Sequence, residues 1–284
     1  MMPHMRPGST NAKPAVPAVV PRPALSRTGI AVTLGLLLSA CGISTDDEVA
    51  IGKENATKIE QQLPLVQDPV AVAYLDSLGQ AIASRADERG LTWRFRLVDS
   101  DEVNAFALPG GFIYINRGLV ARAESLSELA GVLGHEIGHV TMRHSAKQME
   151  KAQRTGVGVT LLCTLTNVCD NSIGRVAVQA GGSALMAKFS RADELEADSV
   201  AVHYVADAGY DPDGIPTMFR NLMQERSRRP DVVGAWFGTH PLEEDRVQQA
   251  ERLIAAADGD LPADLVKDDP RYQEFRARLA PARP

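Results

Sequence analysis

Aromatic side chains make up only 5% of this 284-residue chain, so its core must be built mainly from aliphatic residues. The sequence also lacks an uninterrupted apolar stretch long enough to cross a membrane as a helix. It shows no internal repeat, which argues against an array of helical repeats. The formal net charge is −6, and the first forty residues contain basic residues but no acid. This acidic balance argues against a nucleic-acid-binding protein, which needs a basic surface.

The first forty residues predict a bacterial lipoprotein signal peptide. An apolar run from Ile30 to Leu38 follows Arg27 and is too short for a stable membrane span, but it is typical of a secretion signal. The following residues, LSAC, resemble a lipobox, where cleavage leaves Cys41 as a lipid-modified N-terminus. We therefore expect a chain anchored to a bacterial membrane and facing the periplasm. Because no Asp follows Cys41, the outer membrane is favoured. The alternative is an ordinary secretion signal with an incidental cysteine.

The other two cysteines, Cys163 and Cys169, lie close together in a chain that is expected to be exported. An oxidising periplasm favours a disulfide between them, and two buried thiols are the alternative. Both fall in residues 155–187, which are rich in glycine and small apolar side chains. We expect two short apolar helices here, which could fill space, cover a cleft or face the membrane.

The central feature of the sequence is a helix, expected over about residues 126–153, that contains the pattern H-E-x-x-H. Residues four apart lie on one face of a helix, so His135 and His139 can bind one metal ion. Glu136 would lie beside that ion and accept a proton from an activated water molecule. Ser125 and Glu128 predict a capping box at the helix start. A surface helix with two solvated histidines is the alternative, and the small apolar residues around the pattern argue against it.

A second helix, expected from Ser190 to about Ala208, supplies a candidate third ligand. Glu194 and Asp198 are four residues apart and share a face. Two histidines and one glutamate are a recurring catalytic zinc set, so Glu194 can bind the metal while Asp198 hydrogen-bonds a ligand histidine. Alternatively, acidic residues at a helix start are favoured by the helix dipole alone.

Two nearby polar residues are expected to take no part in metal binding. Glu196 points to another side of its helix, which predicts a solvated or structural acid. In metzincins a third histidine lies six places beyond the second, at a position occupied here by Ser145. His144 is one place off that position, so we expect it to be a solvated residue and not a ligand.

A small sheet is predicted before the metal helix. Residues 92–98 alternate apolar and polar side chains, and residues 103–108 and 112–116 flank a Pro-Gly-Gly turn as a hairpin. An edge strand beside a metal cleft can pair with an extended peptide. The candidate edge residues are Asn104, Ala105 and Phe106. A role for Asn104 in shaping a turn is an equal alternative.

These patterns predict an α+β fold that is mostly helical, with the small sheet packed beside the metal helix. A charged loop is expected near residues 226–231, and the last long helix is expected after His240. The expected organisation is a signal peptide over residues 1–40, a tether and first helix over 41–67, a metallopeptidase domain over 68–258 and a tail over 259–284.

Four separated blocks of this sequence resemble the HtpX/BepA/LoiP-type zinc metallopeptidase family, which is related to the CAAX prenyl and Oma proteases. The blocks are NAF with its Pro-Gly-Gly turn, HEIGH at 135–139, ELEAD at 194–198 and THPLEEDR at 239–246. The resemblance covers about residues 50–257, and with the lipobox the chain looks most like the small periplasmic lipoprotein members.

The resemblance implies a gluzincin-like domain with one zinc ion per chain, bound by His135, His139 and Glu194. Glu136 would be the general base, and Asp198 would support a ligand. By the same resemblance, His240 would stabilise the oxyanion or block the metal in a resting form. Arg246 would hold the wall of the site or the substrate. His240 as an ordinary residue at a helix start is the alternative.

The sequence thus predicts a zinc endopeptidase that hydrolyses peptide bonds in envelope proteins, with quality control as its expected role. Its partners would be polypeptide substrates and, through the lipid on Cys41, a membrane, whereas the sequence gives no oligomeric state. The main alternative is a quality-control lipoprotein that binds clients with little turnover, kept closed by His240 or by residues 155–187. A purely structural lipoprotein would bind no metal.

Overall fold

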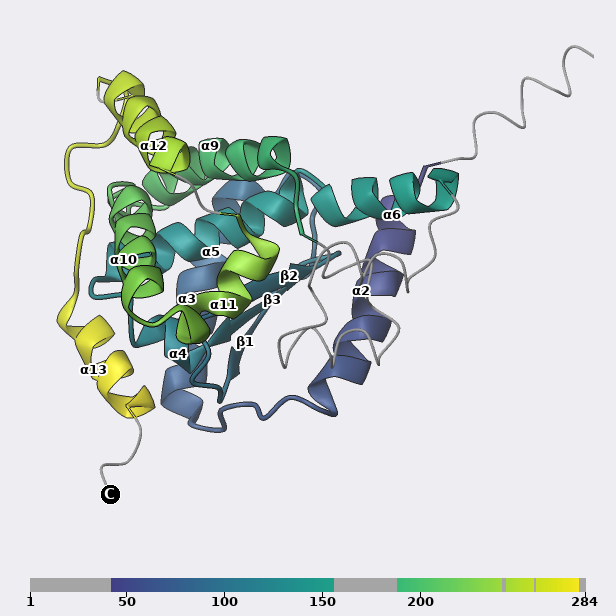
Figure 1. Ribbon diagram of the computed structural model, residues 1–284, viewed down its shortest axis with the longest axis horizontal. Helices are drawn as coiled ribbons and strands as arrows, with labels where there is room; N and C mark the ends of the chain where they lie inside the picture. The colour runs from purple at the N-terminus through teal and green to yellow at the C-terminus, as the bar shows by residue number, and fades with distance from the viewer. Residues whose placement is uncertain (1–41, 156–187, 242–243, 258, 281–284) are drawn as a thin grey trace, which may run out of the picture. The chain divides into compact units, whose positions relative to one another are not determined.

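Three strands form a sheet, and the hairpin expected from the sequence is part of it. The computed structural model describes residues 42–155, 188–241, 244–257 and 259–280. The strands are β1 (Arg94–Val98), β2 (Ala105–Leu108) and β3 (Phe112–Asn116). Strand β3 pairs in parallel with β1 and antiparallel with β2, in the order β1-β3-β2 (Figure 1). Within the described residues, β2 is therefore an edge strand.

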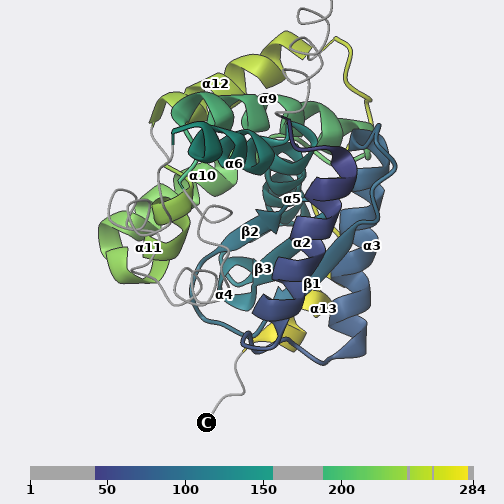
Figure 2. The ribbon, with the colours of Figure 1, turned by 90° about the vertical axis from the view of Figure 1, so that its right-hand side faces the viewer.

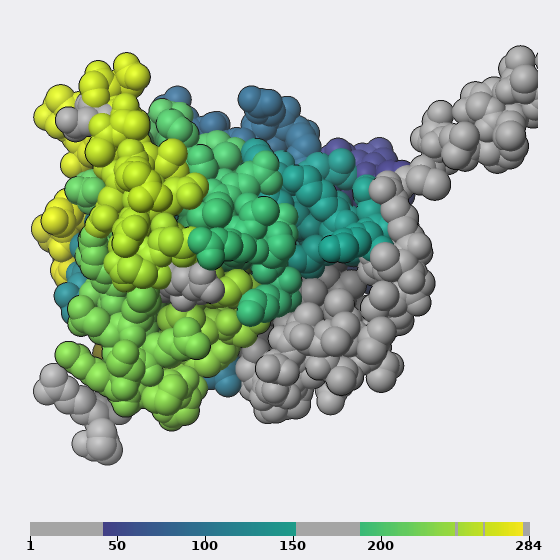
Figure 3. Space-filling view, turned by 45° about the horizontal axis from the view of Figure 1, so that its top comes forward, coloured from purple at the N-terminus to yellow at the C-terminus, as the bar shows by residue number. Residues whose placement is uncertain are grey.

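Helices form most of the rest of the described chain, which confirms a mostly helical α+β fold. The helix bounds are α2 (Thr45–Glu60), α3 (Pro69–Ala86), α4 (Arg117–Val120), α5 (Leu126–Thr141), α6 (His144–Thr155), α9 (Arg191–Asp207), α10 (Gly214–Arg228), α11 (Pro230–Thr239), α12 (Glu244–Ala257) and α13 (Pro270–Leu279). Helix α12 packs against both α9 and α10, and residues of these helices appear on the face shown in Figure 3. No helix in this part of the chain is both long enough and apolar enough to span a membrane.

The two faces of the sheet pack against different helices. Alternate residues such as Ile113 and Ile115 join the main core with α3 and α5, as expected from the two-residue period of a strand. On the other face, the stacked rings of Phe106 and Tyr114, with centroids 4.7 Å apart, pack against α2. Figure 2 shows α2 lying across this face. The hairpin turn needs glycine here, since Gly110 has φ +78° and a Cβ on it would lie 2.7 Å from the Cα of Val49 in α2.

Helix α5 is the central element of the main core. Every residue from Leu126 to Val140 is buried, and the helix contacts α3, α9, α10 and strand β2. The predicted capping box at its start is wrong. The Ser125 hydroxyl accepts no backbone N–H of the helix, and the Glu128 carboxylate instead accepts the backbone N–H of Glu124 at 2.8 Å.

The metal helix is also shorter than predicted. It ends at Thr141 and a second helix, α6, starts at His144, because Arg143 between them adopts the left-handed conformation with φ +60°. The Arg143 guanidinium donates to Glu48 at 2.8 Å, and Arg89 donates to the carbonyl of Val140 at 2.8 Å. These contacts hold the chain at the break.

Two helices were not predicted. The charged loop expected near residues 226–231 is wrong, because α10 continues to Arg228 and α11 begins at Pro230. In α11, Val233 and Trp236 are buried. Residues 270–279, in the expected tail, form α13 after the expected last helix. Its Tyr272 and Phe275 belong to the main core, so this part of the tail packs with the domain. The predicted signal peptide, Cys41 and the pair Cys163 and Cys169 lie outside the described residues.

Candidate metal centre

Two glycines of α5 allow α9 to approach closely. A Cβ at Gly138 would lie 3.0 Å from the Cγ2 of Val200 and 3.1 Å from the carbonyl oxygen of Ala197. A Cβ at Gly134 would lie 2.6 Å from the side chain of Val205. The absence of side chains at these positions therefore sets the short distance between the helix that carries the histidines and the helix that carries the acids.

The start of α9 is fixed by a capping box at Ser190. The Ser190 hydroxyl accepts the backbone N–H of Asp193 at 3.2 Å, and the Asp193 carboxylate accepts the backbone N–H of Ser190 at 3.0 Å. Glu194 and Asp198 follow in the next two turns, and both are fully buried against α5. The structure thus brings both acids to the same side as His135 and His139.

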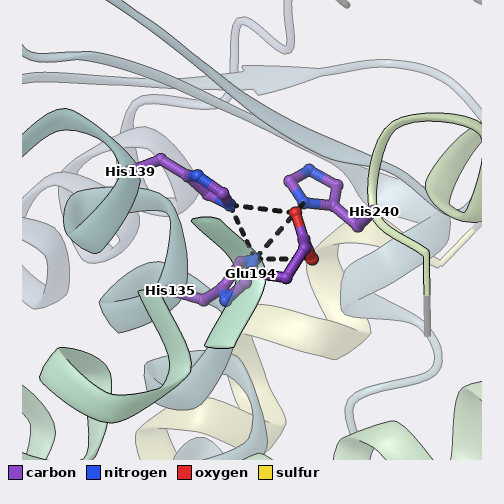
Figure 4. Close-up of side chains that lie close together, drawn as sticks. All are labelled: His135, His139, Glu194 and His240. Atoms are coloured by element: carbon purple, nitrogen blue, oxygen red, sulfur yellow. Dashed lines mark hydrogen bonds and ion pairs between the residues drawn. The ribbon is translucent and has the colours of Figure 1, made fainter. Parts of the chain in front are cut away.

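Four side chains converge at one point, namely His135, His139, Glu194 and His240 (Figure 4). The Nε2 atoms of His135 and His139 are 3.0 Å apart. The Glu194 carboxylate lies 3.7 Å from the first Nε2 and 3.4 Å from the second. The Nδ1 of His240 is 3.2 Å from both His135 Nε2 and Glu194 Oε1.

These distances fit a four-coordinate metal ion. Ligand atoms about 2.0–2.1 Å from a tetrahedral zinc ion are separated by roughly 3.3 Å from one another. The separations between the four side chains, from 3.0 to 3.7 Å, bracket that value. Two imidazole nitrogens and a carboxylate are also the donor types that bind zinc in catalytic sites.

The ring nitrogen of His135 that faces away from the other ligands, Nδ1, is hydrogen-bonded to Asp198. The Nδ1 of His135 lies 2.8 Å from Asp198 Oδ1, so it donates its proton there and leaves the Nε2 lone pair facing the other ligands. Arg246 donates from Nε and Nη2 to the two oxygens of Asp198, and from Nη1 to Glu194. Arg246 is 1% exposed, so the structure places it in the wall of the site.

The Nδ1 of His139 is hydrogen-bonded to His144, which the sequence analysis expected to be solvated. This expectation is wrong, because His144 is fully buried and its Nδ1 lies 2.8 Å from the Nδ1 of His139. The Nε2 of His144 lies 2.9 Å from Glu196 Oε2, which makes Glu196 a structural acid. The position of His144 depends on the break at Arg143, and the H-E-x-x-H spacing gave no signal for that break.

Burial and neighbouring charges set the protonation of the ligands. Burial alone would raise the pKa of Glu194, but His240 and Arg246 hold it well below its usual value. Asp198 is likewise buried, and Arg246 and the hydrogen bond from His135 lower its pKa. Burial lowers the pKa of His139 well below the ordinary histidine value. The protein therefore presents ionised carboxylates and a neutral imidazole, as a cation requires.

Glu136 lies beside the four ligand atoms and is completely buried. Within the described part of the chain, neither of its carboxylate oxygens has a hydrogen-bond partner, and the Nε2 of His240 lies 3.4 Å from its Oε1. Burial raises the pKa of Glu136. Conversely, burial tends to lower the pKa of His240, but the carboxylates of Glu194 and Glu136 outweigh that effect and raise it. The Trp236 ring stacks on His240 with centroids 4.6 Å apart.

The candidate substrate residues lie at the start of the edge strand. Ala105 and Phe106 belong to β2, and Asn104 precedes it. Asn104 is buried, its carbonyl accepts the N–H of Asn116 at 3.0 Å, and its side-chain oxygen has no partner among the described residues. Strand β2 contacts α5, the helix that carries the histidines, and its unpaired edge is the one away from β3.

Comparison with known proteins identifies similar chains. The profile of peptidase family M48 matches residues 69–254. A beta-barrel assembly-enhancing protease of Yersinia pestis is 33% identical over 214 residues, and that of Escherichia coli K12 is 32% identical over 217 residues. Each alignment covers 73% of this chain. The mitochondrial metalloendopeptidase OMA1 of Arabidopsis thaliana is 33% identical over 184 residues, or 64% of this chain.

The aligned region is a minor part of each relative. It covers 44% of the length of the two bacterial proteases and 34% of the plant protein. The similarity therefore concerns the segment that carries the metal centre, and what else these relatives do is a property of their whole chains.

Proposed function

Because the chain belongs to peptidase family M48, we propose that it is a zinc-dependent endopeptidase whose metal is held by His135, His139 and Glu194. The observation that carries this proposal is the spacing of the ligand atoms, which matches the edges of a tetrahedral zinc site. The Nδ1 atoms of both α5 histidines are already hydrogen-bonded, which supports the role of their Nε2 atoms as ligands.

The chain's own residues suit peptide hydrolysis at this position. When bound, the zinc ion would supply the Lewis acidity that activates water and polarises a peptide carbonyl. Glu136 would take the proton of the attacking water and later donate it to the leaving amine, a role that its raised pKa favours. Asp198 and Arg246 would keep His135 and Glu194 in place. Strand β2 would bind the substrate backbone at its free edge.

The metal centre is closed to solvent. His135, Glu136, His139, Glu194 and His240 are at most 1% exposed, so a peptide reaches them only after some covering element moves. The Nδ1 of His240 lies among the ligand atoms, in the place that a catalytic site keeps open for water. This position favours the blocking role for His240 over an oxyanion role in this form.

We also propose that the substrates are envelope proteins and that the enzyme acts in the periplasm, attached to the outer membrane through a lipid on Cys41. The support for this is the lipobox-like sequence and the similarity to bacterial proteases named as enhancing beta-barrel assembly. Labelling with a radioactive fatty acid tests the anchor, since Cys41→Ser should abolish incorporation.

The test of the catalytic proposal is casein digestion together with metal analysis of the purified protein. We expect about one zinc per chain, and cleavage that a chelator stops. Glu136→Gln should lower cleavage by about 10²-fold or more while the metal stays bound. Glu124→Gln, at an exposed position in the turn before α5, is the matched control and should cleave normally. A protein that binds no divalent metal, or a Glu136→Gln variant that cleaves casein normally, would refute the proposal.

The closed site also favours a second candidate, a quality-control protein that binds clients with little turnover. In that case, unfolded client proteins would bind with or without metal. The Glu136→Gln variant would then behave like the wild type in the cell. Loss of the cellular function in that variant would exclude this candidate.

A further inference from the structure

A chain of hydrogen bonds leads from the ligand His139 away from the metal centre. Its Nδ1 lies 2.8 Å from the Nδ1 of His144, and the Nε2 of His144 lies 2.9 Å from Oε2 of Glu196. Both histidines are buried, whereas the Glu196 side chain is 46% exposed. These hydrogen bonds therefore connect a buried metal ligand to an acid at the surface.

Glu196, the outermost acceptor of these hydrogen bonds, determines which ring nitrogen of each histidine carries the proton. The Glu196 carboxylate can only accept, so the proton of His144 is on Nε2 and its Nδ1 carries a lone pair. That lone pair accepts from His139, whose proton is therefore on Nδ1. The Nε2 of His139 is left with its lone pair directed at His135 and Glu194, as metal binding requires.

The helix break is what makes this contact possible. In a continuous α-helix, five residues turn through about 500°, so His144 would point about 140° away from His139. The left-handed Arg143 ends α5 and turns His144 back under His139. On the other side, the ring of Phe189 stacks on His139 with centroids 3.9 Å apart, so His139 is held from two directions.

We propose that His144 and Glu196 are positioning residues that fix the tautomer and ring orientation of His139 for metal binding. The proposal rests on the proposed zinc site and adds the residues that prepare one of its ligands. It predicts that removing the acceptor on His144 weakens metal binding by about 10- to 100-fold, the usual effect of losing a partner of a metal-bound histidine.

The experiment compares variants of the purified protein by zinc competition with a chelator and by the melting temperature of the metal-free form. His144→Phe keeps a ring but offers no acceptor, and it should show the full loss of affinity. His144→Asn keeps an oxygen near the position of Nδ1 and should stay within a few-fold of the wild type. Lys147→Met is the matched control. Lys147 also contacts Glu196, at 3.4 Å, but takes no part in the hydrogen bonds that lead to His139. Its affinity should not change.

Each outcome decides the question. Equal affinities of His144→Phe and the wild type overturn the inference, and so does an equal loss in His144→Phe and His144→Asn, because packing would then be the cause. If His144→Phe does not fold, Glu196→Leu at the half-exposed position decides instead: weaker zinc binding supports the inference and unchanged binding overturns it. A wild type that binds no zinc overturns the proposed function together with this inference. A wild type that binds zinc and cleaves casein leaves the proposed function standing whatever His144 does.

Discussion

Arg246 and Asp198 face each other in a buried two-point ion pair, with Nε 2.7 Å from Oδ2 and Nη2 2.8 Å from Oδ1. The same guanidinium donates to Glu194, so one cation on α12 neutralises two acids on α9. All three side chains are at most 1% exposed. This charge arrangement therefore fixes two of the groups around the metal centre.

Removing the cation of this pair should destabilise the protein strongly. Arg246→Met leaves Asp198 and Glu194 without their buried partner, and we expect a loss of about 3–5 kcal/mol in the free energy of unfolding. Urea unfolding of the metal-free protein measures it. Lys58→Met, which removes an exposed ion pair with Glu54, is the control and should cost less than about 1 kcal/mol. Similar costs for both variants would show that Arg246 does not compensate the buried acids.

His240→Ala tests whether this histidine keeps the site closed. Its Nδ1 lies 3.2 Å from both His135 Nε2 and Glu194 Oε1, as a fourth ligand would. Removing it should weaken zinc binding but open a coordination position, so we expect casein cleavage to rise several-fold at saturating zinc. The measurement is the initial cleavage rate at several zinc concentrations. A fall in rate at saturating zinc would instead favour the oxyanion role.

The close approach of α5 and α9 predicts an unusual cost for a small substitution. In Gly138→Ala the new methyl group would lie 3.0 Å from Val200 and 3.1 Å from the carbonyl of Ala197, so α9 must shift by a few tenths of an ångström at this contact. We expect lower stability and weaker zinc binding, because Glu194 moves away from the histidines. Alanine is otherwise the better helix former by about 1 kcal/mol. Gly234→Ala in α11, where nothing lies within 4 Å, should show only that gain. Thermal unfolding and chelator competition measure both, and a stabilised Gly138→Ala would contradict the explanation.

The metal centre was predictable from the sequence wherever its contacts follow one helix. His135 and His139 on α5, and Glu194 and Asp198 on α9, each obey the four-residue spacing. The contact of His144 with His139 was not predictable, since it depends on the left-handed Arg143, which is held by Glu48 from the distant α2.

The limits on predicting the fold have the same origin. The hairpin of β2 and β3 is local and follows from its turn, whereas the parallel pairing of β1 with β3 joins residues that the turn does not relate. Helix α13 is strongly charged in sequence, and only its packing of Tyr272 and Phe275 into the main core makes it part of the domain. Local patterns thus define the elements, and long-range contacts decide which of them complete the core.

The buried acid at the start of α5 predicts a pH-dependent difference in stability. Burial raises the pKa of Glu128 above its ordinary value of 4.5, so the folded protein binds this proton more tightly than the unfolded chain does. Stability from this group is therefore present at low pH and is lost as the pH rises through the folded-state pKa.

Glu128→Gln should remove this loss of stability at high pH and still keep the hydrogen bonds of the side chain. One carboxylate oxygen accepts from the Glu124 N–H at 2.8 Å and from Asn221 at 3.3 Å, and the other lies 3.4 Å from the Ser125 hydroxyl. A glutamine can keep all three, with its oxygen accepting and its amide donating to the serine. We expect the variant to melt at a higher temperature than the wild type at pH 8, and the difference to vanish below pH 4.5. Glu88→Gln, at an exposed position after α3, is the control, with a melting curve like that of the wild type at both pH values. A Glu128→Gln variant that is less stable at pH 8 would show that the charge of Glu128 supports the helix start.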